Sequence, residues 1–428
     1  MILSNHEYDV IVAGGGPSGI AAAVAAARNG AKTLLIERYG FLGGAGTAMM
    51  VNPWMTYSAG PKQIIYGVLQ ELIDGMSELG MYGHPKQKTA FDPEALKYVA
   101  EHLCLDAGVE LLYHTFLGDA QMDDSIRYIQ SIRVANKAGI MDLKAKIYVD
   151  TTGDADLSAL AGATVEKGRE VDSLSQPMTL NFRMANVDID RMPSREGMTE
   201  LYIEAKKRGE LRCPRENVLW FYANQEGVIH FNQTRVILKD ATNPWELTAA
   251  EIEAREQVQE FVAFLKKHVD GFENAYLQTT APQIGVRESR RVIGDYKLTA
   301  EELLNACKFD DVVALGSYPV DIHNPAGEGT LLQYLKPGEW YDIPYRSLIP
   351  KKIDNLIVGG RPISATHEAH SALRVQPIAI AIGQAAGTAA ALCAKEGKLP
   401  RESDVKQIQN SLLEQGAYLG PQFEKKTV

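Results

Sequence analysis

The stretch Tyr8-Asp-Val-Ile-Val-Ala-Gly-Gly-Gly-Pro-Ser-Gly19 decides the fold. It leads a short apolar strand into a glycine-rich turn and then into a small-residue helix, which we expect from Ser18 to about Arg28. Gly14 allows the tight turn, Gly16 lets the backbone approach a phosphate, and Gly19 lets helix and strand pack closely. The pattern therefore predicts a cradle for a dinucleotide pyrophosphate.

The helix start and the next strand supply the other parts of this pattern. Where Pro17 and Ser18 begin the helix, free N–H groups are available to an anion. A second strand over Lys32–Ile36 ends in Glu37, which lies 18 residues beyond Gly19 and is placed to accept hydrogen bonds from ribose hydroxyls. Arg38 follows, so a solvated carboxylate beside an arginine is the alternative. The spacing favours an adenosine without a 2′-phosphate.

Composition limits the class of protein. The 428 residues suggest two or three domains, and 45% of them are apolar. The net charge is −10, and basic residues occur only in short pairs such as Lys266-Lys267, Lys351-Lys352 and Lys425-Lys426. We therefore expect neither nucleic acid nor an anionic membrane as a partner, and a homo-oligomer stays possible.

The cysteines and the apolar segments indicate a reduced, cytoplasmic protein. Cys104, Cys213, Cys307 and Cys393 include no Cys-x-x-Cys pair, which argues against a redox dithiol, a zinc site or an iron–sulfur cluster. We therefore expect no metal. Residues 1–7 contain no apolar stretch of signal-peptide length. Glycines interrupt the most apolar run, Ile378–Ala394, which we interpret as a buried helix.

The middle of the chain alternates helix, strand and hairpin signals. Asp92-Pro93 begins a predicted helix that ends at Gly108, and a strand over Val109–His114 follows. A hairpin over 126–150 leads to Thr152-Gly153-Asp154-Ala155. Residues 165–345 hold polar helices and scattered strands without a second glycine fingerprint. Two expected capping boxes, Thr248 with Glu251 and Thr299 with Glu302, mark helix starts there.

The carboxyl-terminal part returns to the cofactor pattern. Asn355-Leu-Ile-Val-Gly-Gly-Arg361 is a predicted strand that ends in glycines, and Ser371–Ile378 leads into an alanine-rich helix. Pro377 suits the first turn of that helix. The N–H groups near Gln376 and Ile378 would meet an anionic edge of a ligand.

Together these motifs resemble the FAD-dependent oxidoreductase family, the two-dinucleotide-fold flavoproteins related to the flavoprotein subunits of fumarate reductases. The resemblance also includes Gly43-Gly44 and Ile284-Gly-Val-Arg-Glu-Ser-Arg-Arg291. It implies an α/β fold, a Rossmann-like FAD-binding domain with an inserted α+β substrate domain. The expected segments are 1–165 and 346–400 for the FAD-binding domain, 166–345 for the substrate domain, and 401–428 for a carboxyl-terminal helix and tail.

The resemblance also implies a set of FAD-binding residues. Val109 would contact the adenine through its backbone, and the N–H groups near Gln376 would face the flavin N1–C2=O edge. No histidine accompanies Gly43-Gly44, so we expect dissociable FAD. The full expected set is Gly14, Gly16, Pro17, Ser18, Gly19, Glu37, Arg38, Gly43, Gly44, Thr47, Val109, Thr152, Gly153, Asp154, Gly360, Arg361, Arg374, Gln376 and Ile378.

Arginines and histidines are the candidate catalytic groups. Arg287 and Arg291 flank Glu288 and would clamp a carboxylate, although ion pairs alone would also explain them. His323, close to Asp321, is a candidate general acid or base, or a histidine that only shapes its loop. His367 and the nearby His370 are further candidates, some of which would only bind FAD.

The expected activity is transfer of a hydride equivalent between flavin and a small, possibly carboxylate-bearing, organic substrate. No second nucleotide fold is visible, so electrons would enter from the substrate or from a transient donor. Two alternatives stay open. One is an FAD-binding tRNA-modifying protein or non-redox binding protein, and the other is an NAD-binding dehydrogenase, which leaves Gly43-Gly44 and the carboxyl-terminal return unexplained.

Overall fold

A parallel sheet forms the centre of the computed structural model, which describes residues 7–424. The amino-terminal residues 1–6 and the Lys425-Lys426 pair discussed above lie outside the described residues. The parallel strands run side by side in the order β5 (Glu110–Leu112), β2 (Thr33–Ile36), β1 (Glu7–Ala13), β8 (Gly139–Asp150) and β19 (Leu356–Val358). This arrangement confirms the predicted α/β class.

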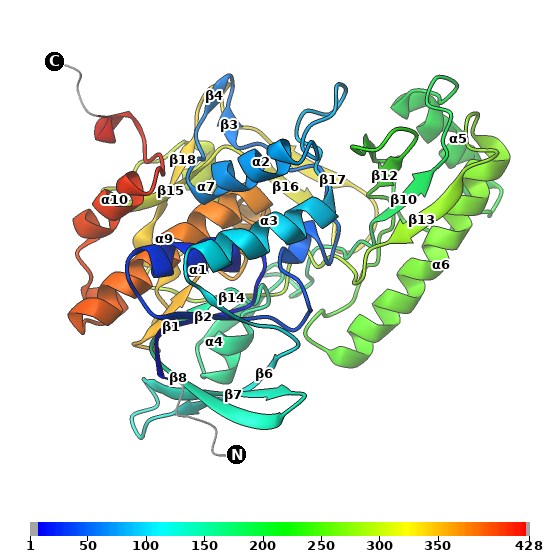
Figure 1. Ribbon diagram of the computed structural model, residues 1–428. Helices are drawn as coiled ribbons and strands as arrows, with labels where there is room; N and C mark the ends of the chain where they lie inside the picture. Colours follow the sequence, from blue (N-terminus) through cyan, green and yellow to red (C-terminus); the bar gives the residue numbers. More distant parts are fainter. Residues whose placement is uncertain (1–6, 425–428) are drawn as a thin grey trace.

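Helices cover one face of this sheet, and a hairpin branches from it (Figure 1). The covering helices are α1 (Pro17–Arg28), α2 (Val68–Glu78), α3 (Pro93–Asp106) and α9 (Gln376–Glu396). β7 (Ile129–Asn136) pairs antiparallel with the first part of β8, which forms the hairpin predicted over 126–150, and β6 (Phe116–Met122) pairs antiparallel with β7. The short helix α4 (Asp156–Leu160) lies on the hairpin side.

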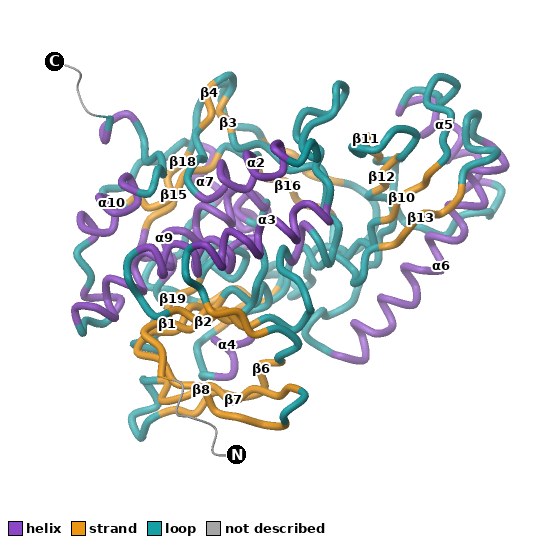
Figure 2. The backbone as a smooth tube through the Cα atoms, viewed as in Figure 1, coloured by secondary structure: helices purple, strands orange, loops and turns teal. Residues whose placement is uncertain are grey.

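A second, smaller body carries its own antiparallel sheet and core, seen at the right of Figures 1 and 2. Its strands run in the order β11 (Trp220–Tyr222), β12 (Ile229–Phe231), β10 (Phe182–Ala185) and β13 (Tyr276–Thr280). The helices α5 (Arg195–Lys207) and α6 (Pro244–His268) pack against it. The inserted body therefore has the predicted α+β character.

The second core ends earlier than the expected boundary at residue 345. Its buried residues, apart from Met50, run from Met178 to Val286. The elements that follow, α7 (Ala300–Leu304), β15 (Val312–Gly316) and β18 (Tyr341–Pro344), contribute to the core of the first body instead. Their apolar side chains pack beside α9 and α8 (His367–Leu373), so residues 290–345 belong mainly to the first body.

Short elements complete the chain. β9 (Val165–Lys167) pairs with β14 (Arg290–Val292), β16 (Val320–His323) with β17 (Thr330–Gln333), and β3 (Ser58–Ala59) with β4 (Lys62–Gln63). The helix α10 (Val405–Glu414) confirms the expected carboxyl-terminal helix. Single 3₁₀ turns occur at Gly44–Gly46, Tyr345–Leu348, Pro400–Glu402 and Pro421–Phe423.

One predicted helix start is wrong. Thr299 and Glu302 form the expected capping box at the start of α7. In α6, however, Thr248 lies inside the helix, and Asn243 caps its start by accepting from the N–H groups of Trp245 and Glu246. The helix begins about one turn earlier than predicted. Asn243 caps its first N–H groups, and the ring of Pro244 fixes φ at a value that suits the first helical residue.

The two helices that begin at the cavity, α1 and α9, touch backbone to backbone. A Cβ atom on Gly383 would lie 2.1 Å from the Ser18 carbonyl oxygen, and one on Gly387 would lie 1.9 Å from that of Ala22. By length and mean hydropathy α9 is able to span a membrane, but 89% of its apolar window is buried in the structure. This packing confirms the prediction of a buried helix with small-residue faces.

The substitution Gly387→Ala is expected to lower the free energy of unfolding by about 3 kcal/mol, because the added methyl group collides with the backbone of α1. Urea denaturation of the purified variant measures this loss. The control is Gly118→Ala in β6, where the nearest atom to an added Cβ is 3.6 Å away, and we expect a change of about 0.5 kcal/mol. Equal effects of the two substitutions would contradict the close packing.

Candidate functional site

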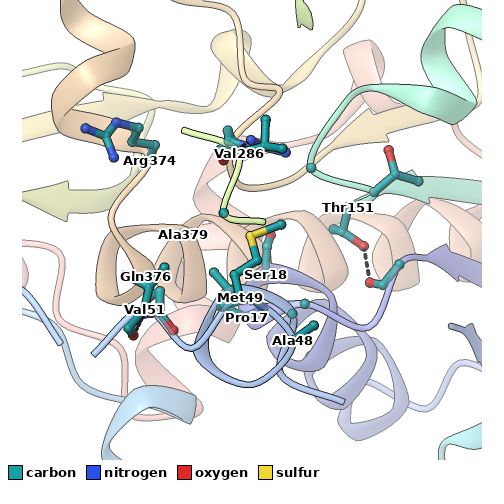
Figure 3. Close-up of a pocket in the computed structure, with 18 of the residues that line it drawn as sticks. Pro17, Ser18, Ala48, Met49, Val51, Thr151, Val286, Arg374, Gln376 and Ala379 are labelled. Atoms are coloured by element: carbon teal, nitrogen blue, oxygen red, sulfur yellow. Dashed lines mark hydrogen bonds between the residues drawn. The ribbon is translucent and has the colours of Figure 1, made fainter. Parts of the chain in front are cut away.

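A cavity of about 360 Å³ lies where the parallel strands end. Residues that directly follow β1, β2, β8 and β19 line it, because the carboxyl ends of parallel strands meet at one edge of a sheet. Figure 3 shows Ser18 from α1, Met49 from a loop and Gln376 from α9 gathered around it. Residues of the second body, including Phe221 and Arg287, complete the wall.

The glycine turn after β1 has the geometry of an anion cradle. Gly14 adopts a φ of 101°, and a Cβ on Gly19 would lie 1.8 Å from the Gly14 carbonyl oxygen. Gly16, Pro17 and Ser18 line the cavity at the start of α1. The Ser18 hydroxyl is buried there without a hydrogen-bond partner, so a ligand oxygen would satisfy it.

Glu37 lies at one end of the cavity with its carboxylate already oriented. Its Oε2 accepts from the Gly15 N–H (2.7 Å), and its Oε1 accepts from the Tyr39 N–H (3.0 Å). Burial raises the pKa of Glu37, while these two backbone donors act against that rise. A carboxylate held in this way is able to accept hydrogen bonds from ribose hydroxyls, as predicted.

Arg38 lines the same end but is tied to the second body. Its guanidinium and the Tyr39 hydroxyl both donate to the side-chain oxygen of Gln283, which also lines the cavity. The Gln283 N–H in turn donates to the carbonyl of Ala48 (3.0 Å). The loop that contains Gln283 therefore closes over the Glu37 end.

The second glycine loop packs directly on the first. The Gly43 N–H donates to the Gly15 carbonyl (2.9 Å), and a Cβ on Gly44 would lie 2.7 Å from the Gly16 Cα. Gly44 lines the cavity, whereas Gly43 and Thr47 support it from behind. The Thr47 hydroxyl donates to the Leu42 carbonyl (2.7 Å) and holds the turn closed.

Of the other residues predicted to bind the cofactor, some line the cavity and others only contact the residues that line it. Thr152, Gly153 and Arg361 line the cavity. Asp154 does not, because its carboxylate accepts from Arg361 (2.5 Å) and Ser289 (2.5 Å). Gly360 also lies outside the wall, and a Cβ there would meet Ser18 at 2.7 Å.

The predicted role of Val109 is wrong. It precedes β5, at the strand-start edge of the sheet, whereas the cavity lies at the strand ends. The segment after β5, with Thr115, Phe116 and Leu117, lines the cavity instead, and the Thr115 N–H donates to the Glu37 carbonyl. Because β5 runs toward the cavity, the residues after the strand line the cavity and the residue before it does not.

The start of α9 forms the opposite part of the wall. Val375, Gln376 and Ala379 line the cavity, while Ile378 is fully buried and points away from it. The Gln376 amide is fixed because it donates to the Val51 carbonyl (2.7 Å) and accepts from the Trp54 indole (3.1 Å). The positive end of the helix dipole therefore faces the cavity, as predicted.

Four arginines surround His323, which lines the cavity: Arg215 and Arg235 are buried, and Arg287 and Arg374 are partly buried. Arg287 and Arg374 line the wall, and Arg215 and Arg235 lie behind His323. Burial lowers the pKa of Arg287, and the charges of the other arginines lower it further. Within residues 7–424, Arg215 and Arg287 form no ion pair. Positive charge therefore exceeds negative charge here.

His323 presents a defined nitrogen to the cavity. Arg235 donates to its Nδ1 (3.0 Å), and because a guanidinium only donates, a neutral imidazole carries its proton on Nε2. Burial and the surrounding arginines lower the pKa of His323, which keeps the ring neutral at neutral pH. Asp321 lies 3.7 Å from Nε2, so Arg235 and not Asp321 orients the ring.

Arg291 and His367 do not reach the cavity, which corrects the expectation that they contact substrate. Both are buried against Glu288, which accepts from the Arg291 guanidinium and from His367 Nδ1 (2.8 Å). Arg291 also donates to the carbonyls of Gly168 and Ala365. His370 is fully buried outside the wall. Glu288 therefore organises a structural cluster at this position.

The described cysteines are free thiols, with Cys104, Cys213 and Cys393 buried and Cys307 partly buried. Burial raises the pKa of Cys393 to about 11, and its sulfur lies 3.0 Å from the Ser403 hydroxyl. Between residues 7 and 424, no group of three or more His, Cys, Asp or Glu side chains is placed to hold a metal ion.

Comparison with known proteins decides the family. The model of a family described as FAD dependent oxidoreductase matches residues 9–412. The chain belongs to this family. It is therefore an FAD-dependent enzyme, and the buried Ser18 hydroxyl, the glycine cradle and Glu37 fit that cofactor.

Curated relatives of this FAD-dependent oxidoreductase are partial matches. The thiamine thiazole synthase of Methanococcus vannielii is 32% identical over 179 residues, which are 39% of this chain and 64% of that protein. The thiamine thiazole synthase of Methanococcus aeolicus is 29% identical over 36% of this chain and 57% of that protein. The chain thus spans about three fifths of the length of these relatives.

Solved structures that resemble this oxidoreductase are distant. A geranylgeranyl bacteriochlorophyll reductase-like protein from Thermoplasma acidophilum is 16% identical, with a TM-score of 0.45 over 97% of this chain and 84% of that one. A flavin-dependent brominase is 13% identical, with a TM-score of 0.49 over 95% of this chain and 83% of that one.

Sequence reasoning missed part of the arginine cluster around His323. It did not select Arg215 or Arg235, and it assigned Arg374 to FAD alone. Arg215 and Arg235 lie in the second body, more than 100 residues from Arg374 along the chain. Nothing in the local sequence marks them, because only the folding of the second body over the strand ends brings them to His323.

Asp156 predicts a pH dependence of stability. Burial, with the carboxylates of Asp154 and Asp150, raises its pKa from 3.8 to about 6 despite Arg290 at 2.9 Å. The folded state therefore binds this proton more tightly, so Asp156 costs stability above about pH 6 and costs none below about pH 4. Asp156→Asn is expected to raise the thermal midpoint at about pH 7.5, and this gain should vanish near pH 4.

Differential scanning calorimetry of the two proteins across this pH range makes the measurement. Asp172→Asn is the matched control, because the side chain of Arg169 lowers the pKa of Asp172 and removal of that charge should slightly lower the midpoint at neutral pH. A midpoint of the Asp156→Asn protein at or below wild type at about pH 7.5 would contradict the prediction.

Proposed function

We propose that this enzyme transfers a hydride equivalent between noncovalently bound FAD and a small organic substrate that carries a carboxylate. The observation that supports it is the cluster of buried and partly buried arginines around His323, two of which line the cavity. Buried cations are costly unless an anion compensates them, and a carboxylate matches the fork geometry of arginine. Sulfate-like or phosphate-bearing molecules are the competing anions.

Different residues of the cavity would bind different parts of FAD and of the substrate. Glu37 would hold the adenosine ribose, the cradle of Gly14, Gly16 and Ser18 the pyrophosphate, and the start of α9 the flavin end. FAD supplies the two-electron chemistry when it is bound. Arg287 and Arg374 would bind and orient the substrate carboxylate, because both line the wall.

His323 acts in this proposal as a donor and not as a base. Its Nδ1 lone pair is occupied by Arg235, and its Nε2 carries the proton. It would therefore donate a hydrogen bond from Nε2 to a substrate oxygen and stabilise negative charge that develops on that atom. The apolar side chains of Met49, Val51 and Leu219 exclude water on the remaining wall.

Substitution of Arg287 should reduce the catalytic efficiency with the substrate more than any other single change. Arg287→Gln is expected to reduce kcat/KM for a carboxylate substrate by about 10- to 100-fold, since it removes a buried charge-assisted hydrogen bond. Arg287→Lys should lose less, because it keeps the charge but not the fork. An anaerobic screen of carboxylate compounds for bleaching of the flavin identifies the substrate, and stopped-flow reduction compares the variants.

Arg255→Gln on the surface of α6 is the control for a general loss of arginine and should leave the rate unchanged. If Arg287→Gln reduces the flavin as fast as wild type at low substrate concentration, Arg287 does not bind substrate. Bleaching only by compounds without a carboxylate would overturn the proposed substrate class.

The noncovalent linkage has its own test. Acid precipitation of the purified protein should release all the yellow colour into the supernatant, where mass spectrometry identifies FAD. Flavin that stays with the pellet would show a covalent bond. Recovery of NAD instead of FAD would favour the dehydrogenase alternative, and a salt-sensitive shift of tRNA in a gel would favour the tRNA-modifying one.

A further inference from the structure

Gln176 and Pro177 contact every cationic or imidazole-bearing residue that lines the proposed carboxylate end. The Gln176 side-chain oxygen accepts from Arg374 Nη2 (3.3 Å) and from the backbone N–H of His323 (3.3 Å). The Pro177 carbonyl accepts from Arg287 Nη1 (2.8 Å). Two adjacent residues outside the cavity wall thus link the groups that would bind the substrate.

A buried carboxylate holds this dipeptide in place. The Gln176 N–H donates to Glu288 Oε2 (3.0 Å), and the other oxygen of Glu288 accepts from Arg291 and His367. Gln176 is only 2% exposed. Its position therefore depends on the Glu288 cluster and not on contacts with solvent.

The neutrality of Gln176 matters for the charge of the site. An amide oxygen accepts from a guanidinium without cancelling its charge, whereas a carboxylate here would make the same hydrogen bonds and remove one positive charge. Arg374 has only a distant acid, Asp321 at 4.0 Å. The Nε of Arg374 and the Nε2 of Gln176 are both buried without partners.

We propose that Gln176 is a positioning residue that sets the preference of the site for anions. It orients Arg374 and His323 relative to Arg287 and leaves the positive charge of the arginines for the substrate. This inference rests on the proposed carboxylate site. It predicts that the charge of residue 176, more than its size, controls anion affinity.

Two substitutions of Gln176 separate charge from packing. Gln176→Glu keeps the size and the acceptor but adds a negative charge, and Gln176→Met keeps the approximate size but removes the acceptor. The probe is formate, the smallest carboxylate, with formamide as its neutral counterpart. Each is titrated into the FAD-loaded full chain, and the change in the flavin absorbance is followed.

In the wild type, formate should give a saturable spectral change and formamide a much weaker one. Gln176→Glu is expected to raise the formate dissociation constant at least about tenfold, and Gln176→Met about threefold, with FAD content and the formamide response unchanged. A merely structural glutamine would instead alter FAD content or thermal midpoint in both variants without a selective loss of formate.

The outcomes distinguish this inference from the proposed function. A wild type that does not respond to formate overturns the carboxylate site and the inference with it. A wild type that responds, together with a Gln176→Glu protein of equal formate affinity, overturns the inference alone. If the Gln176→Glu protein does not retain FAD, the formate dissociation constant of the Gln176→Met protein tests the inference instead. A value equal to that of the wild type overturns the inference.

Discussion

The backbone contact between α1 and α9 is the constraint on which the cofactor site depends. Both helices begin at the cavity, and their starts can face the same ligand only if they lie close together. Gly383 and Gly387 permit this, since any side chain there would collide with the carbonyls of Ser18 and Ala22. The last segment of the chain is thereby fixed against the first.

The second body reaches the same cavity, in part through one loop. Residues 178–286 form a separate core, yet the loop at Gln283–Arg287 reaches both ends of the cavity. Gln283 closes over Arg38 and Tyr39, and Arg287 contributes charge near His323. The second body therefore contributes one short loop both to the part of the cavity near Arg38 and to the part near His323.

The positions of local motifs could be predicted from the sequence where residues only a few positions apart determine the backbone geometry. The turn at Gly14, the carboxylate of Glu37 and the start of α9 each depend on a strand, a tight turn or a helix start within a few residues. Val109 shows the limit of this reasoning. Its strand was predicted, but which end of the strand faces the ligand depends on the direction of the strand within the sheet.

The sequence by itself determined the α/β class, the dinucleotide cradle and the choice of FAD, because these follow from short motifs whose backbone geometry is local. Only the tertiary structure decided which arginines surround His323. Arg291, one of the two arginines predicted to clamp a carboxylate, is paired with Glu288, whereas Arg215 and Arg235 come from a distant segment to surround His323. Charge in a buried site depends on which side chains meet across the fold, and that pairing is a long-range property of packing.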